Sequence, residues 1–139
     1  KDAEDDFELT IQEQIVEATA AADVIWVVIE ADVMITEEDR RVAKMALKSK
    51  KPVFLVVNKA DKAKKATAED YQRLGIKPIF LTSATQRRGV DQLLNELINI
   101  IPKAMQAESD NKLRIALLGR PNVGKSNLFN TKEKLTILR

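Results

Sequence analysis

The fold of this chain is decided by residues 113–126, which read LRIALLGRPNVGKS. The apolar run 113–118 has the composition of a buried strand, and the loop 119–126 matches the phosphate-binding pattern G-x-x-x-x-G-K-[ST] at every defined position. The apolar pair Leu128-Phe129 follows, which completes the strand–loop–helix setting that the motif requires. The stretch therefore predicts an α/β domain with an anion-binding loop.

Further apolar runs predict the other strands of the sheet. They are the β-branched run 23–29, the run 52–57 and the short run 78–81, and residues 135–138 suit a short fifth strand. Continuous apolar runs of this kind are typical of strands that are buried on both faces, as in parallel sheets. We therefore expect a mainly parallel sheet.

Helical patterns separate the first strands. Residues 6–22 carry apolar side chains at helical spacing. Thr36 and Asp39 have the spacing of a capping box, with Asp in place of the usual Glu. We expect the helix that starts there to turn the following residues inward: Val42, Met45 and Ala46.

The clearest helical pattern follows Gly89 and ends before Pro102. Its apolar stripe consists of Val90, Leu93, Leu94, Leu97, Ile98 and Ile101. The polar stretch 103–112 that follows is the best candidate for a linker. Strands that alternate with helices along the chain predict a three-layer α/β fold of the P-loop NTPase type, with strand ends gathered at one edge.

Composition excludes several classes of function. The chain has 139 residues, a formal net charge of +2, no cysteine and no histidine. These absences exclude disulfides, thiolate or histidine metal sites and histidine-based acid–base catalysis. No apolar run approaches the roughly 20 residues of a membrane span, and the first residues lack a signal-peptide pattern. We therefore expect a cytoplasmic protein with no membrane partner.

A second motif, Asn58-Lys59-Ala60-Asp61, directly follows the run 52–57. A carboxylate at Asp61 can accept hydrogen bonds from both N1–H and N2–H₂ of guanine, whereas adenine has no N1–H. Asn58 would tie the loop to its neighbours, and the aliphatic stem of Lys59 would cover one face of the base. The motif predicts a loop that selects guanine.

The third strand ends in a small-residue turn that includes Ser83 and Ala84. Such a turn lets a backbone N–H approach the guanine O6. The phosphates would be bound in the loop 119–126 by backbone N–H groups and a helix N-terminus. Lys125 would bridge the terminal phosphate oxygens and act as the catalytic cation, and the Ser126 hydroxyl would bind Mg²⁺. The predicted phosphate-binding residues are Asn122, Val123, Gly124, Lys125, Ser126 and Asn127.

Together these three elements resemble those of TRAFAC-class P-loop GTPases. Residues 119–127 resemble the phosphate loop of Era- and Der-like bacterial GTPases. Residues 8–14, 22–28 and 58–61 resemble the first G domain of the Der family, whose members carry two G domains in tandem. The resemblance implies binding and hydrolysis of GTP, the cofactors GTP/GDP and Mg²⁺, and a role in maturation of the large ribosomal subunit.

The resemblance also implies a division of the chain. Residues 1–102 resemble the C-terminal two-thirds of a first G domain, residues 103–112 a linker, and residues 113–139 the phosphate-loop strand and start of a second G domain. We expect the strand 113–118 to pack into the same sheet beside 24–29, because both would otherwise expose apolar edges. The strand order would then be permuted relative to an ordinary G domain.

One element of the family pattern is missing, the D-x-x-G motif. The four glycines are Gly75, Gly89, Gly119 and Gly124, and the residues three positions before them are Gln72, Gln86, Ala116 and Pro121. A threonine of the first switch region and a KH-like third domain are not found either. We therefore expect guanine-nucleotide binding with weak or no hydrolysis.

Several alternatives remain open on the sequence alone. The unusual motif order fits a window across two tandem domains, a circular permutant or chimera, or ordered pieces of a longer chain. A different class of function is an α/β scaffold fragment without useful nucleotide binding. A third possible function, after nucleotide binding and the scaffold, is direct contact with ribosomal RNA through Lys62, Lys64, Lys65, Arg87 and Arg88. The sequence does not predict an oligomeric state.

Overall fold

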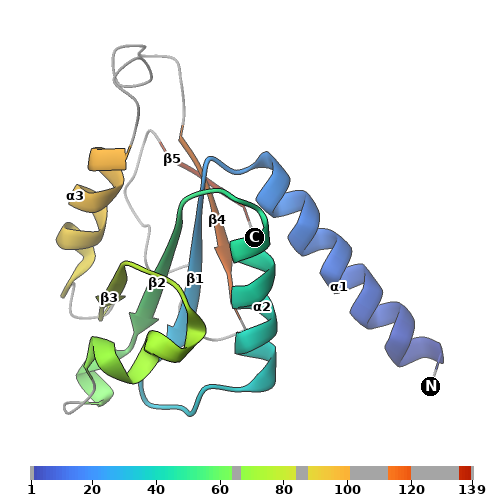
Figure 1. Cartoon of the computed structure of the whole chain (residues 1–139), viewed down its shortest axis with the longest axis horizontal. Coiled ribbons are helices and arrows are strands. Elements are labelled where there is room, and N and C mark those ends of the chain that lie inside the picture. Colours follow the sequence, from blue (N-terminus) through green and yellow to red (C-terminus); the bar gives the residue numbers. More distant parts are fainter. Residues whose placement is uncertain (1, 64–66, 84–87, 101–112, 120–134, 139) are drawn as a thin grey trace.

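The structure of the chain is a computed structural model that describes residues 2–63, 67–83, 88–100, 113–119 and 135–138. Five parallel strands form one sheet in the order β3-β2-β1-β4-β5 (Figure 1). The strands are β1 (Val24–Glu30), β2 (Val53–Asn58), β3 (Ile79–Leu81), β4 (Leu113–Leu118) and β5 (Leu135–Leu138). The predicted α/β fold with a mainly parallel sheet is confirmed.

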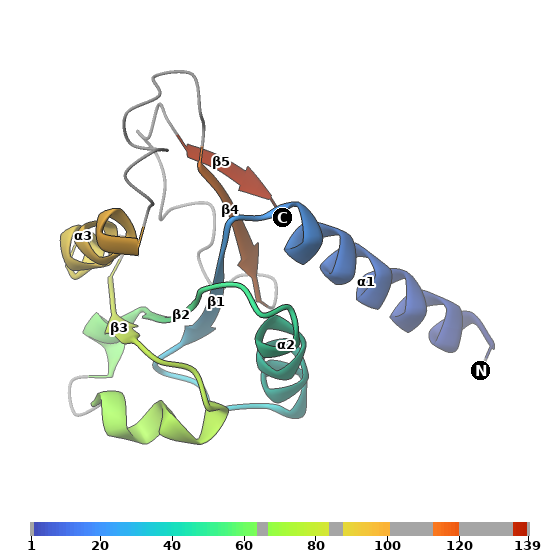
Figure 2. The same ribbon diagram turned by 45° about the horizontal axis from the view of Figure 1, so that its top comes forward.

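Helices cover both faces of this sheet, which gives three layers (Figures 1 and 2). The elements are α1 (Asp2–Ala21), α2 (Glu37–Lys48), α3 (Val90–Ile100) and the 3₁₀ helices η1 (Ala60–Lys62) and η2 (Ala68–Leu74). One face packs against α2, η2 and the end of α1, and the other face packs against α3. None of the helices in the described part of the chain is long and apolar enough to cross a membrane.

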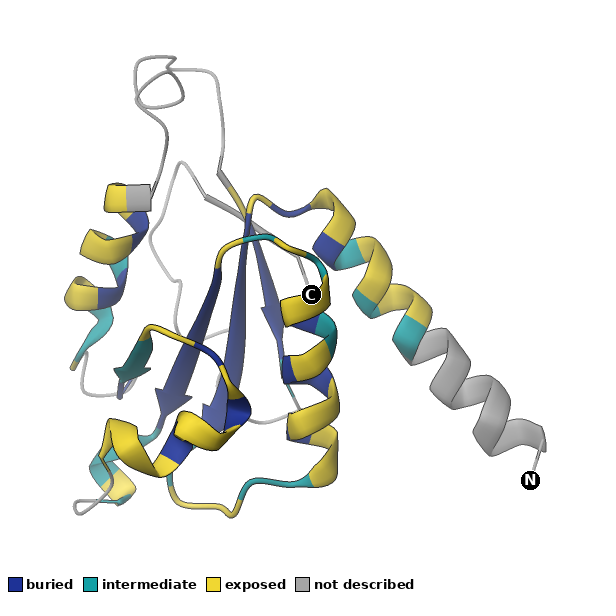
Figure 3. Cartoon of the chain, viewed as in Figure 1, coloured by how far each residue is buried: buried dark blue, intermediate teal, exposed yellow. Residues whose placement is uncertain are grey.

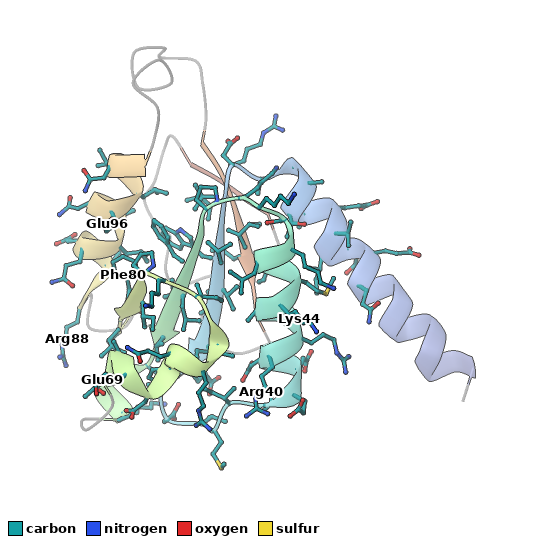
Figure 4. All side chains as sticks on the ribbon, viewed as in Figure 1. Arg40, Lys44, Glu69, Phe80, Arg88 and Glu96 are labelled. Carbon is teal, nitrogen blue, oxygen red and sulfur yellow. The ribbon has the colours of Figure 1, made fainter. Side chains whose placement is uncertain are left out.

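The strand β1 alternates between two apolar clusters, so both its faces are buried (Figure 3). Ile25, Val27 and Ile29 face the cluster under α2, while Val24, Trp26 and Val28 face the cluster under α3. The second cluster is rich in aromatic rings. The rings of Trp26 and Phe54 are stacked with centroids 6.3 Å apart, and the ring centroid of Phe80 on β3 lies 5.4 Å from that of Phe54. Phe80 is labelled in Figure 4.

The helix α2 begins at the predicted capping box. The Asp39 backbone N–H donates to Thr36 Oγ1 at 3.1 Å, and the Thr36 N–H donates to Asp39 Oδ2 at 3.0 Å. These bonds satisfy two N–H groups that the first helical turn would otherwise leave without a partner. Val42 and Ala46 are buried as expected, whereas Met45 is only half-buried.

The structure differs from the sequence-based expectations at further points. The helix α1 begins at Asp2 rather than residue 6. Ile98 is 54% exposed, because it lies about 140° around α3 from the fully buried Leu93 and therefore beyond the face that meets the sheet. The 3₁₀ helix η2 was not predicted, although Tyr71 and Leu74 are buried. Ile101 and the expected linker 103–112 lie outside the described residues.

The start of β4 is bound to the start of β1. The Asp23 N–H donates to the Arg114 carbonyl at 2.8 Å, and the Arg114 N–H donates to Asp23 Oδ2 at 3.0 Å. From there the strands run in register from Val24, which pairs with Ile115, to Val27, which pairs with Leu118. β4 is thus a central strand, and its residues Ile115, Ala116, Leu117 and Leu118 are buried.

Candidate functional site

Because all five strands are parallel, their carboxyl ends lie at one edge of the sheet. Along this edge the order of strands defines a switch point. From β1 the chain continues through β2 to β3 on one side, whereas β4 and β5 lie on the other side. In open α/β sheets ligands bind outside the strand ends at such a point. The switch point here lies between β1 and β4, directly before Gly119.

Asn58, the last residue of β2, is held by the neighbouring strand ends. Its side-chain Oδ1 accepts a hydrogen bond from Thr82 Oγ1 at 3.2 Å, and its carbonyl accepts from the Ala31 N–H at 2.8 Å. The Ala60 N–H in turn donates to the Thr82 carbonyl at 2.9 Å. Asn58 and Thr82 are both buried. The loop 58–61 is therefore anchored to β1 on one side and to the end of β3 on the other.

Lys59 has an unusual backbone conformation, with φ 60° and ψ 33° in the left-handed region. Its Nζ lies 3.2 Å from Glu30 Oε1 at the end of β1. Asp61 follows in the short helix η1 and is half-buried. Asp61 is thus partly accessible to a ligand at the strand ends, as a base-binding carboxylate would have to be.

Ser83 is buried at the end of β3 and forms an antiparallel bridge with Arg88. The Ser83 N–H donates to the Arg88 carbonyl at 2.9 Å, and the Arg88 N–H donates back at 3.0 Å. Gly89 follows with φ +76°, and a Cβ placed on it would come within 2.3 Å of the Leu81 carbonyl oxygen. Gly89 therefore lies so close to the end of β3 that only glycine fits at this position. Ala84 lies outside the described residues.

Tyr71 on η2 forms a hydrogen bond with the loop after β1. The Tyr71 hydroxyl donates to the Ala31 carbonyl at 3.4 Å. Burial raises the pKa of Tyr71 above its usual value, and the charges of Asp70 and Asp32 raise it further. The hydroxyl therefore keeps the proton that it donates. This contact fixes the backbone next to Glu30 at the switch point.

The structure places Asn58, Lys59, Asp61 and Ser83 at the same edge of the sheet as Gly119. Only β1 separates β2 from β4, and Leu118 lies level with Leu55, three residues before Asn58, because both pair with Val27. The ends at Asn58 and Leu118 are thus offset by two strand spacings and three residues, or about 14 Å. The other predicted phosphate-loop residues lie outside the described residues: Asn122, Val123, Gly124, Lys125, Ser126 and Asn127. The motif order along the sequence therefore does not separate the two strand ends in space.

Some of the residues predicted to contact a metal ion or RNA belong to the described part of the chain, and others do not. Among the described residues no group of three or more acidic, histidine or cysteine side chains could hold a metal ion. Ser126, the predicted Mg²⁺ ligand, is not among them. Of the basic residues considered for RNA contact, Lys62 and Arg88 are exposed, and the other three lie outside the described residues.

The Thr82 hydroxyl is expected to stabilise the end of β2. Replacing Thr82 with valine keeps the shape of the side chain but removes the donor to Asn58, so we expect a loss of about 1 kcal/mol of unfolding free energy. Thr82→Ser retains a hydroxyl and serves as the control. Urea unfolding of both variants measures the difference, and equal stabilities would contradict this role of the hydroxyl.

Sequence reasoning missed Glu30 and the close approach of Gly89. Glu30 ends an otherwise apolar strand of the sequence VIWVVIE, and a charged residue there was the available signal. Its partner Lys59 lies 29 positions away in the sequence, so no local pattern connects them. For Gly89 the signal was the position directly before the helix pattern, which suited a helix start as well as a close contact.

A parallel sheet in which the sequence motif 119–126 follows β4, with the loop 58–61 at the same edge as Gly119, is typical of the P-loop nucleotide-binding domains. Comparison with known families narrows this class. The family described as "Elongation factor Tu GTP binding domain" matches residues 11–103, about two thirds of the chain. The chain belongs to this family.

Curated relatives are similar over most of the chain. GTPase Der of Geotalea uraniireducens is 42% identical over 122 residues, which cover 86% of this chain and 28% of the relative. GTPase Der of Mesoplasma florum is 38% identical over 125 residues, 89% of this chain and 28% of the relative. GTPase Der of Mycoplasma mycoides is 40% identical over 128 residues, which cover 89% of this chain and 28% of the relative. The chain thus spans 28% of the length of these relatives.

Proposed function

We propose that the chain is the guanine-nucleotide-binding domain of a Der-like GTPase, in which one nucleotide is bound by the loop 58–61 and the loop 119–126. The observation that carries the proposal is the position of Asn58 and Gly119. Asn58 ends β2 and Gly119 follows β4, and these strands lie on either side of β1, at the switch point where α/β sheets bind ligands. A base and its phosphates, which are separated by a ribose, suit the spacing of the two loops.

The base would be recognised by residues after β2 and β3. The half-buried Asp61 carboxylate would accept hydrogen bonds from guanine N1–H and N2–H₂. Asn58 would hold the loop in place through its contact with Thr82. The turn at Ser83 and Ala84 would bring a backbone N–H to the guanine O6. A ligand without N1–H would leave the carboxylate facing an acceptor, and this mismatch would exclude adenine.

The phosphates would be bound by the loop that follows β4. Backbone N–H groups of Asn122, Val123 and Gly124, together with the side chain of Asn127, would surround them. Lys125 would neutralise the terminal phosphate oxygens. The Ser126 hydroxyl is a hard oxygen donor that suits Mg²⁺, and the ion would neutralise phosphate charge when bound.

The same proposal includes a division of the chain and a permuted strand order. Residues 1–102 would be the C-terminal part of one G domain, 103–112 a linker, and 113–139 the start of a second. The pairing of β4 with β1 supports a sheet that combines the two parts. Without D-x-x-G the domain would bind GDP and GTP but hydrolyse GTP weakly or not at all. The resemblance to the Der family implies a role in large ribosomal subunit biogenesis.

Asp61→Asn tests guanine selection. We expect the wild-type chain to bind GDP and not ADP in calorimetry with Mg²⁺ present. The variant should bind GDP about 10- to 100-fold more weakly, because hydrogen bonds to a charged acceptor contribute about 1.5–3 kcal/mol. Glu69→Gln, an exposed carboxylate on η2, is the matched control and should leave GDP affinity unchanged.

The competing proposal is an α/β scaffold without useful nucleotide affinity. It is favoured by the missing D-x-x-G motif. The same titration separates the two functions. Binding of neither nucleotide by the wild-type chain would support the scaffold and end the proposal of a shared site. Equal binding of GDP and ADP would support phosphate binding by the loop 119–126 but would contradict guanine recognition by Asp61.

A further inference from the structure

The ion pair between Glu30 and Lys59 lies at the switch point of the sheet. Glu30 is the last residue of β1, and its backbone pairs in register with Asn58, the residue before Lys59. The two side chains are largely withdrawn from water, with 13% of the Glu30 side chain and 30% of the Lys59 side chain exposed. A carboxylate in such surroundings requires a charged or hydrogen-bonding partner. The Lys59 Nζ supplies one at 3.2 Å.

The backbone at Lys59 indicates that this geometry has a cost. A left-handed conformation costs a residue with a Cβ roughly 1–2 kcal/mol, and glycine avoids that cost. The described residues contain one other non-glycine case, Lys50, with φ 63°. Lys50 lies just beyond the end of α2, where the left-handed conformation is common. Lys59 follows a strand and has no such explanation, so strain at this point suggests a functional requirement.

The position of Glu30 determines where the lysine charge is held. Asn58 on β2 pairs with Glu30 on one side, while on the other side β4 pairs with β1 only as far as Val27, three residues before Glu30. A carboxylate here draws the Lys59 ammonium back toward β1. A held head group would also restrict the four-carbon stem of the lysine, because its methylenes then join two fixed ends, the backbone and the ammonium.

We propose that Glu30 is a positioning residue for nucleotide recognition: it holds the Lys59 ammonium so that the lysine presents its aliphatic stem to the base. This inference rests on the guanine-nucleotide function proposed above. Glu30 touches no nucleotide atom in this role and acts through Lys59. The charge of Lys59 is neutralised locally, and the phosphates depend on Lys125.

A double-mutant cycle for GDP binding tests the inference. The variants are Glu30→Gln, Lys59→Met and the combination, since methionine keeps an unbranched apolar chain without the charge. Glu37→Gln is the matched control, because Glu37 forms a solvent-exposed ion pair with Arg40 on α2. GDP affinity is measured by calorimetry with Mg²⁺, and urea unfolding of each variant reports on the fold.

We expect Glu30→Gln to weaken GDP binding about three- to tenfold, the range for the net contribution of one hydrogen bond, with little change in the urea midpoint. Lys59→Met should bind GDP within about threefold of wild type, because its apolar stem remains. Adding Glu30→Gln to Lys59→Met should then have no further effect. Glu37→Gln should match the wild type throughout.

Two results would overturn the inference. One is an unchanged GDP affinity in Glu30→Gln. The other is that Glu30→Gln lowers GDP affinity by the same factor in the wild-type chain and in Lys59→Met, which would show that Glu30 acts independently of the lysine. If the wild-type chain binds no GDP at all, the proposed function and this inference fail together. If it binds GDP with Asp61-dependent selectivity while Glu30→Gln has no effect, only this inference fails.

A measurement without nucleotide examines the same contact. An ion-paired lysine ammonium exchanges its protons slowly enough to give a ¹⁵N signal by NMR, whereas a solvated one does not. We expect one such signal to disappear both in Glu30→Gln and in Lys59→Met and to persist in Glu37→Gln. If this ¹⁵N signal persisted in Glu30→Gln, the result would contradict the proposal that Glu30 positions the Lys59 ammonium.

Discussion

Replacing Leu117 with alanine is expected to lower the free energy of unfolding by about 2–5 kcal/mol. Leu117 is 1% exposed, its backbone pairs with Trp26, and its side chain lies in the apolar cluster beneath α3. Truncation removes methyl groups from a close-packed site and leaves a cavity that its neighbours fill only in part. Since domains of this size are stable by about 5–15 kcal/mol, the variant would lose a large share of its stability.

The matched control for this prediction is Arg114→Ala on the same strand. Arg114 is exposed, and its hydrogen bonds with Asp23 use the Arg114 backbone carbonyl and N–H, which alanine retains. We expect a change within about 0.5 kcal/mol. Urea unfolding can be followed by the fluorescence of Trp26, which is the single tryptophan and fully buried. A similar small effect for both variants would mean that β4 does not pack against β1.

The outcome at Leu117 bears on the function as well as on stability. β4 leads directly into Gly119 and the phosphate loop. If β4 is held beside β1, the phosphate loop emerges at the switch point between β1 and β4. If β4 is not held there, the loop 58–61 and the phosphate loop cannot share one nucleotide. The stability experiment therefore tests a requirement of the proposed site before any ligand is added.

The strands were predictable because their signal is local and strong. The β-branched run of β1 and the apolar run of β4 are buried on both faces and carry no competing pattern. The capping box at Thr36 is equally local, since it needs only Asp39 three positions later. By contrast, η2 buries two apolar side chains, Tyr71 and Leu74, over a single short 3₁₀ segment. So few residues do not establish a helical period.

Contacts between distant residues set the limit of prediction for the candidate site. The types of residue in the loop 58–61 indicated a base-binding role, and this role remains a prediction. The sequence did not reveal that Asn58 accepts from Thr82, 24 positions away, or that Lys59 reaches back to Glu30. Such contacts depend on strand order, and strand order depends on which buried edges meet. The phosphate-loop residues after Gly119 lie outside the described residues, so their role also remains a prediction.

Gly89→Ala is expected to destabilise the chain by about 3 kcal/mol or more, because it adds a steric clash to a backbone penalty. The added Cβ would lie 2.3 Å from the Leu81 carbonyl oxygen and 3.3 Å from the Thr82 Cα. Both are backbone atoms and cannot rotate away. Either the strand end or the turn before α3 must move. A shift of Thr82 would disturb its bonds to Asn58 and Ala60, so GDP affinity should fall at least about tenfold.

Gly75→Ala provides the matched control for this substitution. Gly75 has almost the same backbone angle, φ +77°, but a Cβ there would meet only Leu47 Cδ1, at an ordinary 3.7 Å. It should therefore cost only the backbone penalty of about 1–2 kcal/mol and leave GDP binding intact. The difference between the two variants isolates the contact with Leu81 and Thr82. Equal losses of stability with unchanged GDP affinity in both would show that the close approach at Gly89 does not shape the base-binding edge.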